Sequence, residues 1–194
     1  MVLIVTHSRR GFTDNIAKAI AEGVEEIPNV KAVIKRVNEV QPSDLAEADA
    51  LAIGSPTYLD YISGELKHLL DNTYYKFHKE EKINRLAGKP AAVFVSGRYK
   101  GYLIKKMQFR SVVLEELERL LFHFIGMKKM VGGIHLIHDI SGRDPRAPLP
   151  LTPEQAVLCK NMGRKLALSA RITKLTDYSP KNRQSNKDRG DING

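Results

Sequence analysis

Short apolar runs alternate along the chain with longer segments in which apolar residues recur at helical spacing. The short runs are rich in β-branched residues, as strands of a buried sheet are, and they cover residues 2–5, 30–37, 51–53, 90–95 and 131–137. The segments between them have the periodicity of amphipathic helices. The alternation predicts an α/β fold with helices on both faces of a five-stranded parallel sheet, connected by right-handed crossovers.

Residues with strong positional preferences mark the ends of the predicted elements. Ser63 and Thr152 are suited to cap helix N-termini, and Pro153 suits the first position of the last helix. We expect Gly54 to end the third strand and residues 96–97 to end the fourth. The remaining expectations are a helical face over residues 16–27, a short helix opening at 42, helices over 62–71 and 113–124, and a charged connector over 78–88.

Composition is that of one globular domain. Of the 194 residues, 42% are hydrophobic, which is enough for one sizeable core. We expect a single domain over residues 1–175 and a polar tail over 176–194 that is disordered. No apolar run reaches the about 20 residues that a membrane helix needs. The single cysteine, Cys159, excludes a disulfide framework, and we expect it to pack in the core of a cytoplasmic protein.

The charge is strongly basic, with a formal net value of +9. Phosphates, acidic proteins and nucleic acids are all compatible with such a charge. No DNA- or RNA-binding motif accompanies it, so nucleic acid is not an expected partner. The sequence also lacks the histidine–glutamate spacing of metal sites and the Gly-x-Ser-x-Gly nucleophile motif, and we expect neither a metal nor a nucleophilic side chain.

The loop after the first strand has the composition of a phosphate site. Ser8 and Thr13 supply hydroxyl groups, Arg10 supplies a guanidinium, and Gly11 allows close approach of the backbone. The dinucleotide and nucleoside-triphosphate fingerprints are absent, which favours a monophosphate. The alternative is that the two hydroxyl residues only cap the following helix.

The loop after the third strand has the composition of an aromatic binding wall. It contains Pro56, which fixes its backbone, and Tyr58 and Tyr61, which could lie against a flat ring. Ligands of open α/β sheets bind at the carboxyl ends of parallel strands. The two loops are therefore expected at one edge of the sheet.

Taken together, these loops resemble the flavodoxin-like family, in particular its NAD(P)H:quinone oxidoreductases and FMN reductases. Ser8, Gly11 and Thr13 match the family's Ser/Thr-x-Thr-Gly-x-Thr phosphate loop, and residues 54–58 match its Gly-Ser/Thr-Pro-Thr-Tyr loop in full. The resemblance covers roughly residues 1–175. The sequence departs from the family in three places. Two arginines replace the small residues usual at 9–10, Asp60-Tyr61 replaces a common Gly-Asn, and Arg98-Tyr99-Lys100 replaces a Gly-rich segment. These differences affect the assignment of the substrate more than that of the flavin.

The resemblance implies a flavodoxin-like three-layer sandwich with strand order 2-1-3-4-5 and one FMN per chain. By that resemblance the cofactor-binding residues are Ser8, Arg10, Gly11, Phe12 and Thr13 for the phosphate, Pro56, Thr57, Tyr58 and Leu59 for the ring, and Ser96, Gly97, Arg98, Tyr99 and Gly101 for its other side. No side chain is expected to act as a catalytic group, because the flavin carries the redox chemistry.

The activity implied by the resemblance is hydride transfer from NAD(P)H through FMN to a quinone, a flavin or another acceptor, in a homo-oligomer. The alternative is a non-enzymatic electron carrier that serves a redox protein; carriers of this fold are typically acidic, whereas this chain is basic. A basic cluster over residues 98–110 suggests a contact with the phosphates of NAD(P)H, for which Arg98 and Lys100 are the better candidates. His138 is a lesser candidate for the rim of the site.

Overall fold

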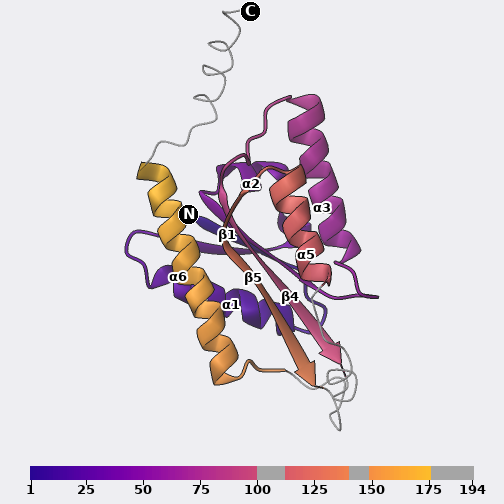
Figure 1. Cartoon of the computed structure of the whole chain (residues 1–194), viewed down its shortest axis with the longest axis vertical. Helices are drawn as coiled ribbons and strands as arrows, with labels where there is room; N and C mark the ends of the chain where they lie inside the picture. Colours follow the sequence, from indigo (N-terminus) through magenta and orange to yellow (C-terminus); the bar gives the residue numbers. More distant parts are fainter. Residues whose placement is uncertain (100–111, 140–148, 176–194) are drawn as a thin grey trace, which may run out of the picture.

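The computed structural model describes residues 1–99, 112–139 and 149–175. Its centre is a five-stranded parallel sheet in the order β2-β1-β3-β4-β5, which confirms the strand order implied by the resemblance (Figure 1). The strands are β1 Val2–Thr6, β2 Ala32–Arg36, β3 Ala50–Pro56, β4 Pro90–Tyr99 and β5 Lys128–Asp139. The helices are α1 Phe12–Glu25, α2 Pro42–Glu47, α3 Gly64–Tyr74, α5 Val112–Arg119 and α6 Pro153–Leu175, with a 3₁₀ turn at Val37–Glu39 and π-helical turns η2 at Tyr75–Glu80 and η3 at Leu120–Phe124.

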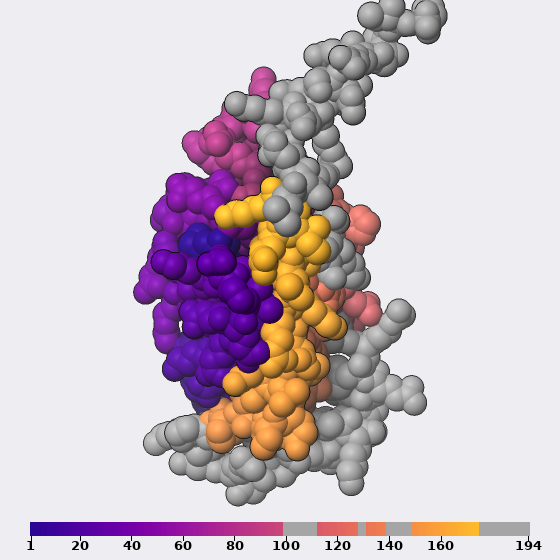
Figure 2. Space-filling model, turned by 90° about the vertical axis from the view of Figure 1, so that its left-hand side faces the viewer, coloured from indigo at the N-terminus to yellow at the C-terminus, as the bar shows by residue number. Residues whose placement is uncertain are grey.

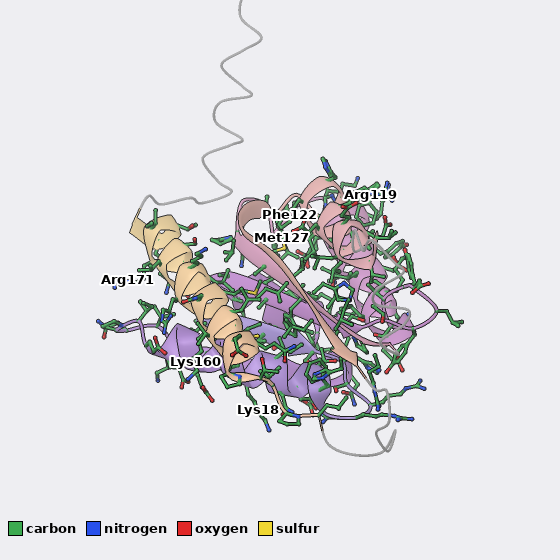
Figure 3. All side chains as sticks on the ribbon, turned by 60° about the horizontal axis from the view of Figure 1, so that its bottom comes forward. Lys18, Arg119, Phe122, Met127, Lys160 and Arg171 are labelled. Atoms are coloured by element: carbon green, nitrogen blue, oxygen red, sulfur yellow. The ribbon has the colours of Figure 1, made fainter. Side chains whose placement is uncertain are left out.

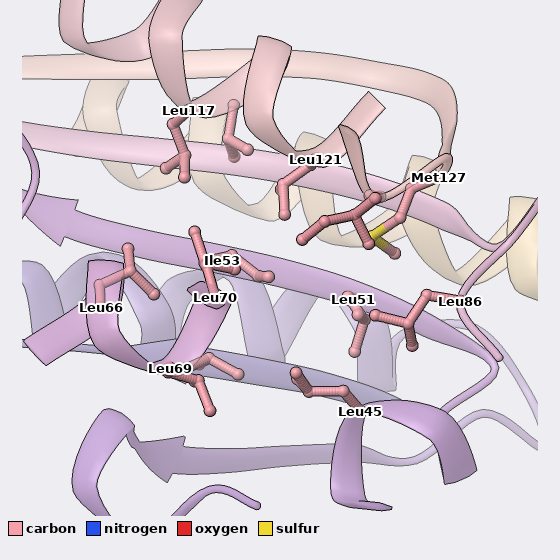
Figure 4. Packing of buried hydrophobic residues seen from close by; sticks show 14 of the residues in the cluster. Leu45, Leu51, Ile53, Leu66, Leu69, Leu70, Leu86, Leu117, Leu121 and Met127 are labelled. Atoms are coloured by element: carbon pink, nitrogen blue, oxygen red, sulfur yellow. The ribbon is translucent and has the colours of Figure 1, made fainter. Parts of the chain in front are cut away.

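Two hydrophobic layers enclose the sheet, one on each face. Alternate residues of β1 show the division, because Val2 and Ile4 pack with α1 and α6 whereas Leu3 and Val5 pack with α2, α3 and α5. Figure 4 shows the second layer, with side chains of α3 and α5 meeting those of β3. All four of these β1 residues are at most 1% exposed. A strand buried on both faces cannot slip by one residue without exchanging its two cores, so the register of β1 is fixed.

Helices α1 and α6 approach each other unusually closely on the first face. A Cβ on Gly163 would lie 2.1 Å from the carbonyl oxygen of Ile20, and a Cβ on Gly23 would lie 2.1 Å from that of Lys160. Figure 2 shows α6 lying along the violet N-terminal segment for most of its length. The two glycines therefore allow a backbone-to-backbone contact that fixes α1, whose first turn lies at the carboxyl end of the sheet.

Several predicted strand boundaries are wrong. Strand β2 is shorter than the predicted 30–37, since it covers Ala32–Arg36, whereas the other four strands are longer than predicted. Strand β3 runs through Gly54 to Pro56, because the ring of Phe94 on β4 fills the space where a Cβ of Gly54 would be. Strand β4 continues through residues 96–97 to Tyr99 and stays paired with β5 as far as Asp139. Here glycine marks a close packing contact and does not end the strand.

The helix ends also differ from prediction. The helix predicted over 113–124 changes to a π-helical turn at Leu120, and the charged connector predicted from residue 78 begins inside the π-helical turn that extends α3. Other expectations are confirmed: Ser63 caps α3 by accepting from the amide of Leu66, and Cys159 is fully buried. The predicted tail over 176–194 lies outside the described residues. In the described part of the chain, no helix is both long and apolar enough to span a membrane.

The α1–α6 contact gives a direct stability test. We predict that Gly163→Ala lowers the free energy of unfolding by about 1–3 kcal/mol, because the added methyl group meets the backbone of α1 and outweighs the helix propensity gained. Urea unfolding followed by circular dichroism measures the change. Gly64→Ala is the matched control, since nothing lies within 4 Å of a Cβ at that position. Equal stabilities of the two variants would contradict the account.

Candidate functional site

A cavity of about 470 Å³ lies where β1, β3 and β4 end, beside the N-terminus of α1. Two backbone contacts define its walls: the amide of Thr57 donates to the carbonyl of Ser96 at 2.8 Å, and the amide of His7 donates to that of Gly54 at 3.3 Å. The lining residues come from three loops and strand ends that are far apart in the sequence, and they are Ser8, Arg9, Arg10, Phe12, Thr13, Pro56, Thr57, Tyr58, Ser96 and Arg98.

The first turn of α1 has no side-chain cap. Its N-cap residue is Gly11, in the left-handed region at a φ of 79°, and no side chain accepts a hydrogen bond from the turn. Thr13, which would be the nearest candidate, instead shares a buried hydrogen bond of 2.9 Å with Ser96 on β4. The alternative that Ser8 and Thr13 merely cap this helix is therefore wrong. The amide groups of the first turn and the helix dipole remain available to an anion.

The loop after β3 is a tight turn held at both ends. Tyr58 and Tyr61 exchange backbone hydrogen bonds of 2.9 and 3.0 Å, and Leu59 and Asp60 between them both have positive φ, as a type I′ turn requires. Behind the turn, the hydroxyl of Ser55 accepts the amide of Ser63 at 2.9 Å. These bonds fix the Tyr58 ring beside the cavity while Leu59 at the tip is fully exposed.

Arg9 connects the two loops and was not among the predicted site residues. Its guanidinium lies 5.2 Å from the centroid of the Tyr58 ring and 3.7 Å from the carboxylate of Glu65. His7 also lies 3.7 Å from Glu65 and meets the Tyr58 ring edge-on. Burial raises the pKa of Tyr58, so the phenol is neutral near pH 7. The available signal was the pair of arginines at residues 9–10, where the resembled family has small residues.

The lining of the cavity is positively charged. Among the described residues that line it are Arg9, Arg10 and Arg98, and none of those described residues is an aspartate or glutamate. Arg10 and Arg98 both line the cavity, and burial and, next in size, the like charge of Arg10 lower the pKa of Arg98. The nearest acidic group in the first turn of α1, Asp14, is directed away and pairs with Arg36 at 2.7 Å. The electrostatic field in the cavity therefore favours a ligand with negative charge.

The structure brings most of the predicted site residues together. Nine of them line the cavity: Ser8, Arg10, Phe12, Thr13, Pro56, Thr57, Tyr58, Ser96 and Arg98. Gly11 forms the helix start beside it, whereas Leu59 and Gly97 are not in its lining. Tyr99 ends β4, while Gly101 and the basic residues from Lys100 to Arg110 lie outside the described residues. The binding role of all these residues stays a prediction.

His138 does not belong to the cavity lining. It is buried at 8% exposure, and its ring packs edge-on against Phe12 with 3.6 Å between the ring centroids. Within the described residues, no three His, Cys, Asp or Glu side chains are grouped so as to hold a metal ion.

A larger cavity of about 760 Å³ lies at another part of the molecule, between α2 and the π-helical turn after α3. Its cations are paired with its own acids, since Lys76 lies 3.2 Å from Glu80 and Arg85 lies 2.6 Å from Glu81. Its described lining has no excess of positive charge, because Glu47, Glu80 and Glu81 outnumber Lys76 and Arg85. Size alone does not make it the better candidate for the functional site.

Residues 4–128 match the family model of flavodoxin, and the chain belongs to the flavodoxin family. A flavodoxin of Aquifex aeolicus is 28% identical over 170 residues, covering 86% of this chain and 84% of that protein. A protein of Geobacter sulfurreducens named NAD(P)H dehydrogenase (quinone) is 29% identical over 170 residues, covering 74% of this chain and 80% of that protein.

Solved structures agree on the fold. A flavodoxin from the domain Archaea superposes with a TM-score of 0.65 at 21% identity, covering 88% of this chain and 98% of that one. Flavodoxin 2 from Bacillus cereus superposes with a TM-score of 0.63 at 23% identity, covering 86% of this chain and 97% of that one. Family membership implies a flavin cofactor, FMN. The cavity suits such a group because it combines an uncapped helix N-terminus, arginines in the lining and an aromatic wall.

Two serines at this site have different surroundings and should respond differently to replacement. Ser55 is fully buried and accepts the Ser63 amide, whereas the part of the chain that the structure describes offers no hydrogen bond to the Ser8 side chain. We predict that Ser55→Ala lowers the free energy of unfolding by about 1–3 kcal/mol, because a buried amide loses its acceptor. Ser8→Ala is the control and should change it by less than about 0.5 kcal/mol. Urea titration of both variants measures these changes. A similar loss of stability in both variants would contradict the predicted difference.

Proposed function

We propose that this protein is an FMN-dependent oxidoreductase that takes a hydride from NAD(P)H and passes electrons to a quinone, a flavin or a similar small acceptor. The observation that carries the proposal is the cavity in which the uncapped first turn of α1, the Tyr58 loop and Arg98 converge, and in which no described lining residue is a carboxylate. Relatives named NAD(P)H dehydrogenase (quinone) support the enzymatic activity.

Each wall of the cavity has a distinct part in this proposal. The amide groups of the first turn of α1, with Ser8 and Arg10, hold the dianionic phosphate of FMN. Pro56, Thr57 and Tyr58 form one wall for the ring, and the end of β4 forms the other. Bound FMN supplies the redox chemistry by accepting a hydride and releasing electrons to an acceptor.

The protein's own contribution is positioning and electrostatics. The buried Thr13–Ser96 hydrogen bond holds the N-terminus of α1 against β4, so that the phosphate and ring portions of the cavity keep a fixed separation. Arg9 lies over Tyr58 and pairs with Glu65, which limits the freedom of the Tyr58 loop. The cationic lining also favours an anionic nucleotide donor, and either NADH or NADPH satisfies this condition.

The proposal also includes a single domain over residues 1–175, a homo-oligomer and a cytoplasmic location.

The second candidate function is that of an electron carrier, which the name of the Aquifex aeolicus relative favours. The net charge of +9 favours the enzyme, because it suits an anionic small-molecule donor.

FMN titration tests the first part of the proposal. We predict that the purified protein binds FMN, and that Arg10→Gln and Ser8→Ala each weaken binding by about three- to tenfold, because each removes one polar contact to the phosphate. Riboflavin, which lacks the phosphate, should bind wild type and both variants with equal affinity. Isothermal titration calorimetry gives the constants. Absence of FMN binding by folded wild-type protein would end the proposal.

Steady-state turnover separates the two candidate functions. An enzyme oxidises NAD(P)H continuously when FMN and a soluble quinone are present, and the rate saturates with both substrates. A carrier binds FMN equally well but gives no NAD(P)H oxidation above the rate of free FMN. The second result would assign the protein to the carriers and leave the cofactor site intact.

A further inference from the structure

An acidic side chain stands in the helix turn where the phosphate of FMN is proposed to bind. Asp14 lies in the first turn of α1, three residues after the N-cap residue Gly11. A carboxylate at this position can fold back onto the amide of the N-cap residue, as the acid of a capping box does. There it would use an amide that an anion needs, and its charge would repel a phosphate. An open helix end therefore requires that the Asp14 carboxylate be held elsewhere.

Both oxygens of this carboxylate are bound at the end of the sheet. Oδ2 of Asp14 accepts a hydrogen bond of 2.7 Å from Nη2 of Arg36, and Oδ1 accepts one of 3.3 Å from the hydroxyl of Thr6. The two donors belong to neighbouring strands, β2 and β1. None of the three residues is among the described residues that line the cavity. The acid is therefore held by groups that lie outside the proposed binding site.

The register of the sheet places the two donors side by side. Thr6 and Arg36 are the last residues of β1 and β2 and are paired with each other in the parallel ladder. Alternate residues of a strand point to the same face of a sheet, so Thr6 lies on the face where Val2 and Ile4 pack with α1. Thr6 is 1% exposed, so its hydroxyl has a fixed position. The fold thus directs both donors at the first turn of α1.

Arg36 supplies a charge as well as a hydrogen bond. The side chain of Arg36 is 56% exposed, whereas that of Asp14 is only 16% exposed. Without Arg36, the Asp14 carboxylate would be largely shielded from water and would lack the cation that offsets its charge. Its negative charge would then act on any anion bound at the first turn of α1. A neutral ligand in the same cavity would not be repelled.

We propose that Arg36 strengthens the preference of the cavity for FMN over riboflavin, because it holds the Asp14 carboxylate away from the first turn of α1 and offsets its charge. The inference rests on the proposed function, since it assumes that the phosphate of FMN binds at this turn. Arg36 is a positioning residue that acts through Asp14. It makes the edge strand β2, which contributes no described residue to the cavity lining, a determinant of specificity for the phosphorylated flavin.

Calorimetry with FMN and with riboflavin measures this preference. The quantity compared is the ratio of the riboflavin dissociation constant to the FMN dissociation constant. In Arg36→Gln we expect this ratio to fall about three- to tenfold through weaker binding of FMN alone, because the charge of Asp14 then repels the phosphate dianion. Arg36→Lys keeps the positive charge and should keep the ratio within about twofold of wild type. An unchanged ratio in Arg36→Gln overturns the inference.

A double-mutant cycle shows whether Arg36 acts through Asp14. Asp14→Asn alone should leave the ratio at or above the wild-type value, because it removes the repelling acid. Arg36→Gln added to Asp14→Asn should then change the ratio by less than about twofold. An equally large fall in the Asp14→Asn background would mean that Arg36 acts on the phosphate without Asp14, and it overturns the inference.

The matched control breaks another ion pair of α1. Lys160 on α6 lies 2.8 Å from Glu22, and Figure 3 labels Lys160 where α6 passes α1. Lys160→Gln therefore removes one positive charge and leaves an acid of the same helix without its partner. Glu22 is about 12 Å further along the helix than Asp14, which exceeds the Debye length of about 8 Å at physiological salt. The ratio should be unchanged in this variant, and a fall equal to that in Arg36→Gln overturns the inference.

The remaining outcomes separate this inference from the proposed function. Equal weakening of FMN and riboflavin binding in Arg36→Gln would indicate a structural role and overturn the inference, while the proposed function would stand. If circular dichroism shows that Arg36→Gln does not fold, Thr6→Val takes its place, because it frees the other oxygen of Asp14. The ratio should then fall in Thr6→Val, and an unchanged ratio overturns the inference. If folded wild-type protein binds no FMN, the proposed function itself fails.

Discussion

The structure depends on one constraint: the first turn of α1 is kept open at the carboxyl edge of the sheet. Gly11 starts the helix without a side-chain cap, and Thr13 uses its hydroxyl to bond Ser96 on β4. The close α1–α6 contact through Gly23 and Gly163 prevents the helix from shifting to relieve its unsatisfied amides. A ligand anion satisfies these amides at no cost in reorganisation, because the scaffold has already fixed their direction.

Electrostatics give this open helix end its selectivity. The arginines of the lining attract phosphate, and the aromatic wall at Tyr58 adds a surface for a flat ring. Arg9 also lines this cavity, and its contacts with Tyr58 and Glu65 connect the loop after β1 to the loop after β3.

The sequence predicted the layers well, because buried parallel strands leave a strong apolar signal. The strand order followed only from the resemblance of two loops to the flavodoxin-like family, and the sheet confirms it. Four of the five strands were predicted too short, and β2 was predicted too long. Gly54 is typical of a strand end, but its lack of a side chain accommodates Phe94, and only the neighbouring strand reveals this. Similarly, Arg9 was missed because its partners Tyr58 and Glu65 are distant in sequence. The π-helical turns at Tyr75 and Leu120 have no short-range sequence signal and follow from tertiary packing.

The most direct measurement of the central claim is a titration of isotope-labelled protein with FMN, followed by the amide resonances in nuclear magnetic resonance. The account predicts that the largest shifts occur in the first turn of α1 at residues 12–14, with further shifts at 56–58 and 96–98. Shifts confined to the cavity between α2 and the π-helical turn after α3, or the absence of shifts at residues 12–14, would contradict it.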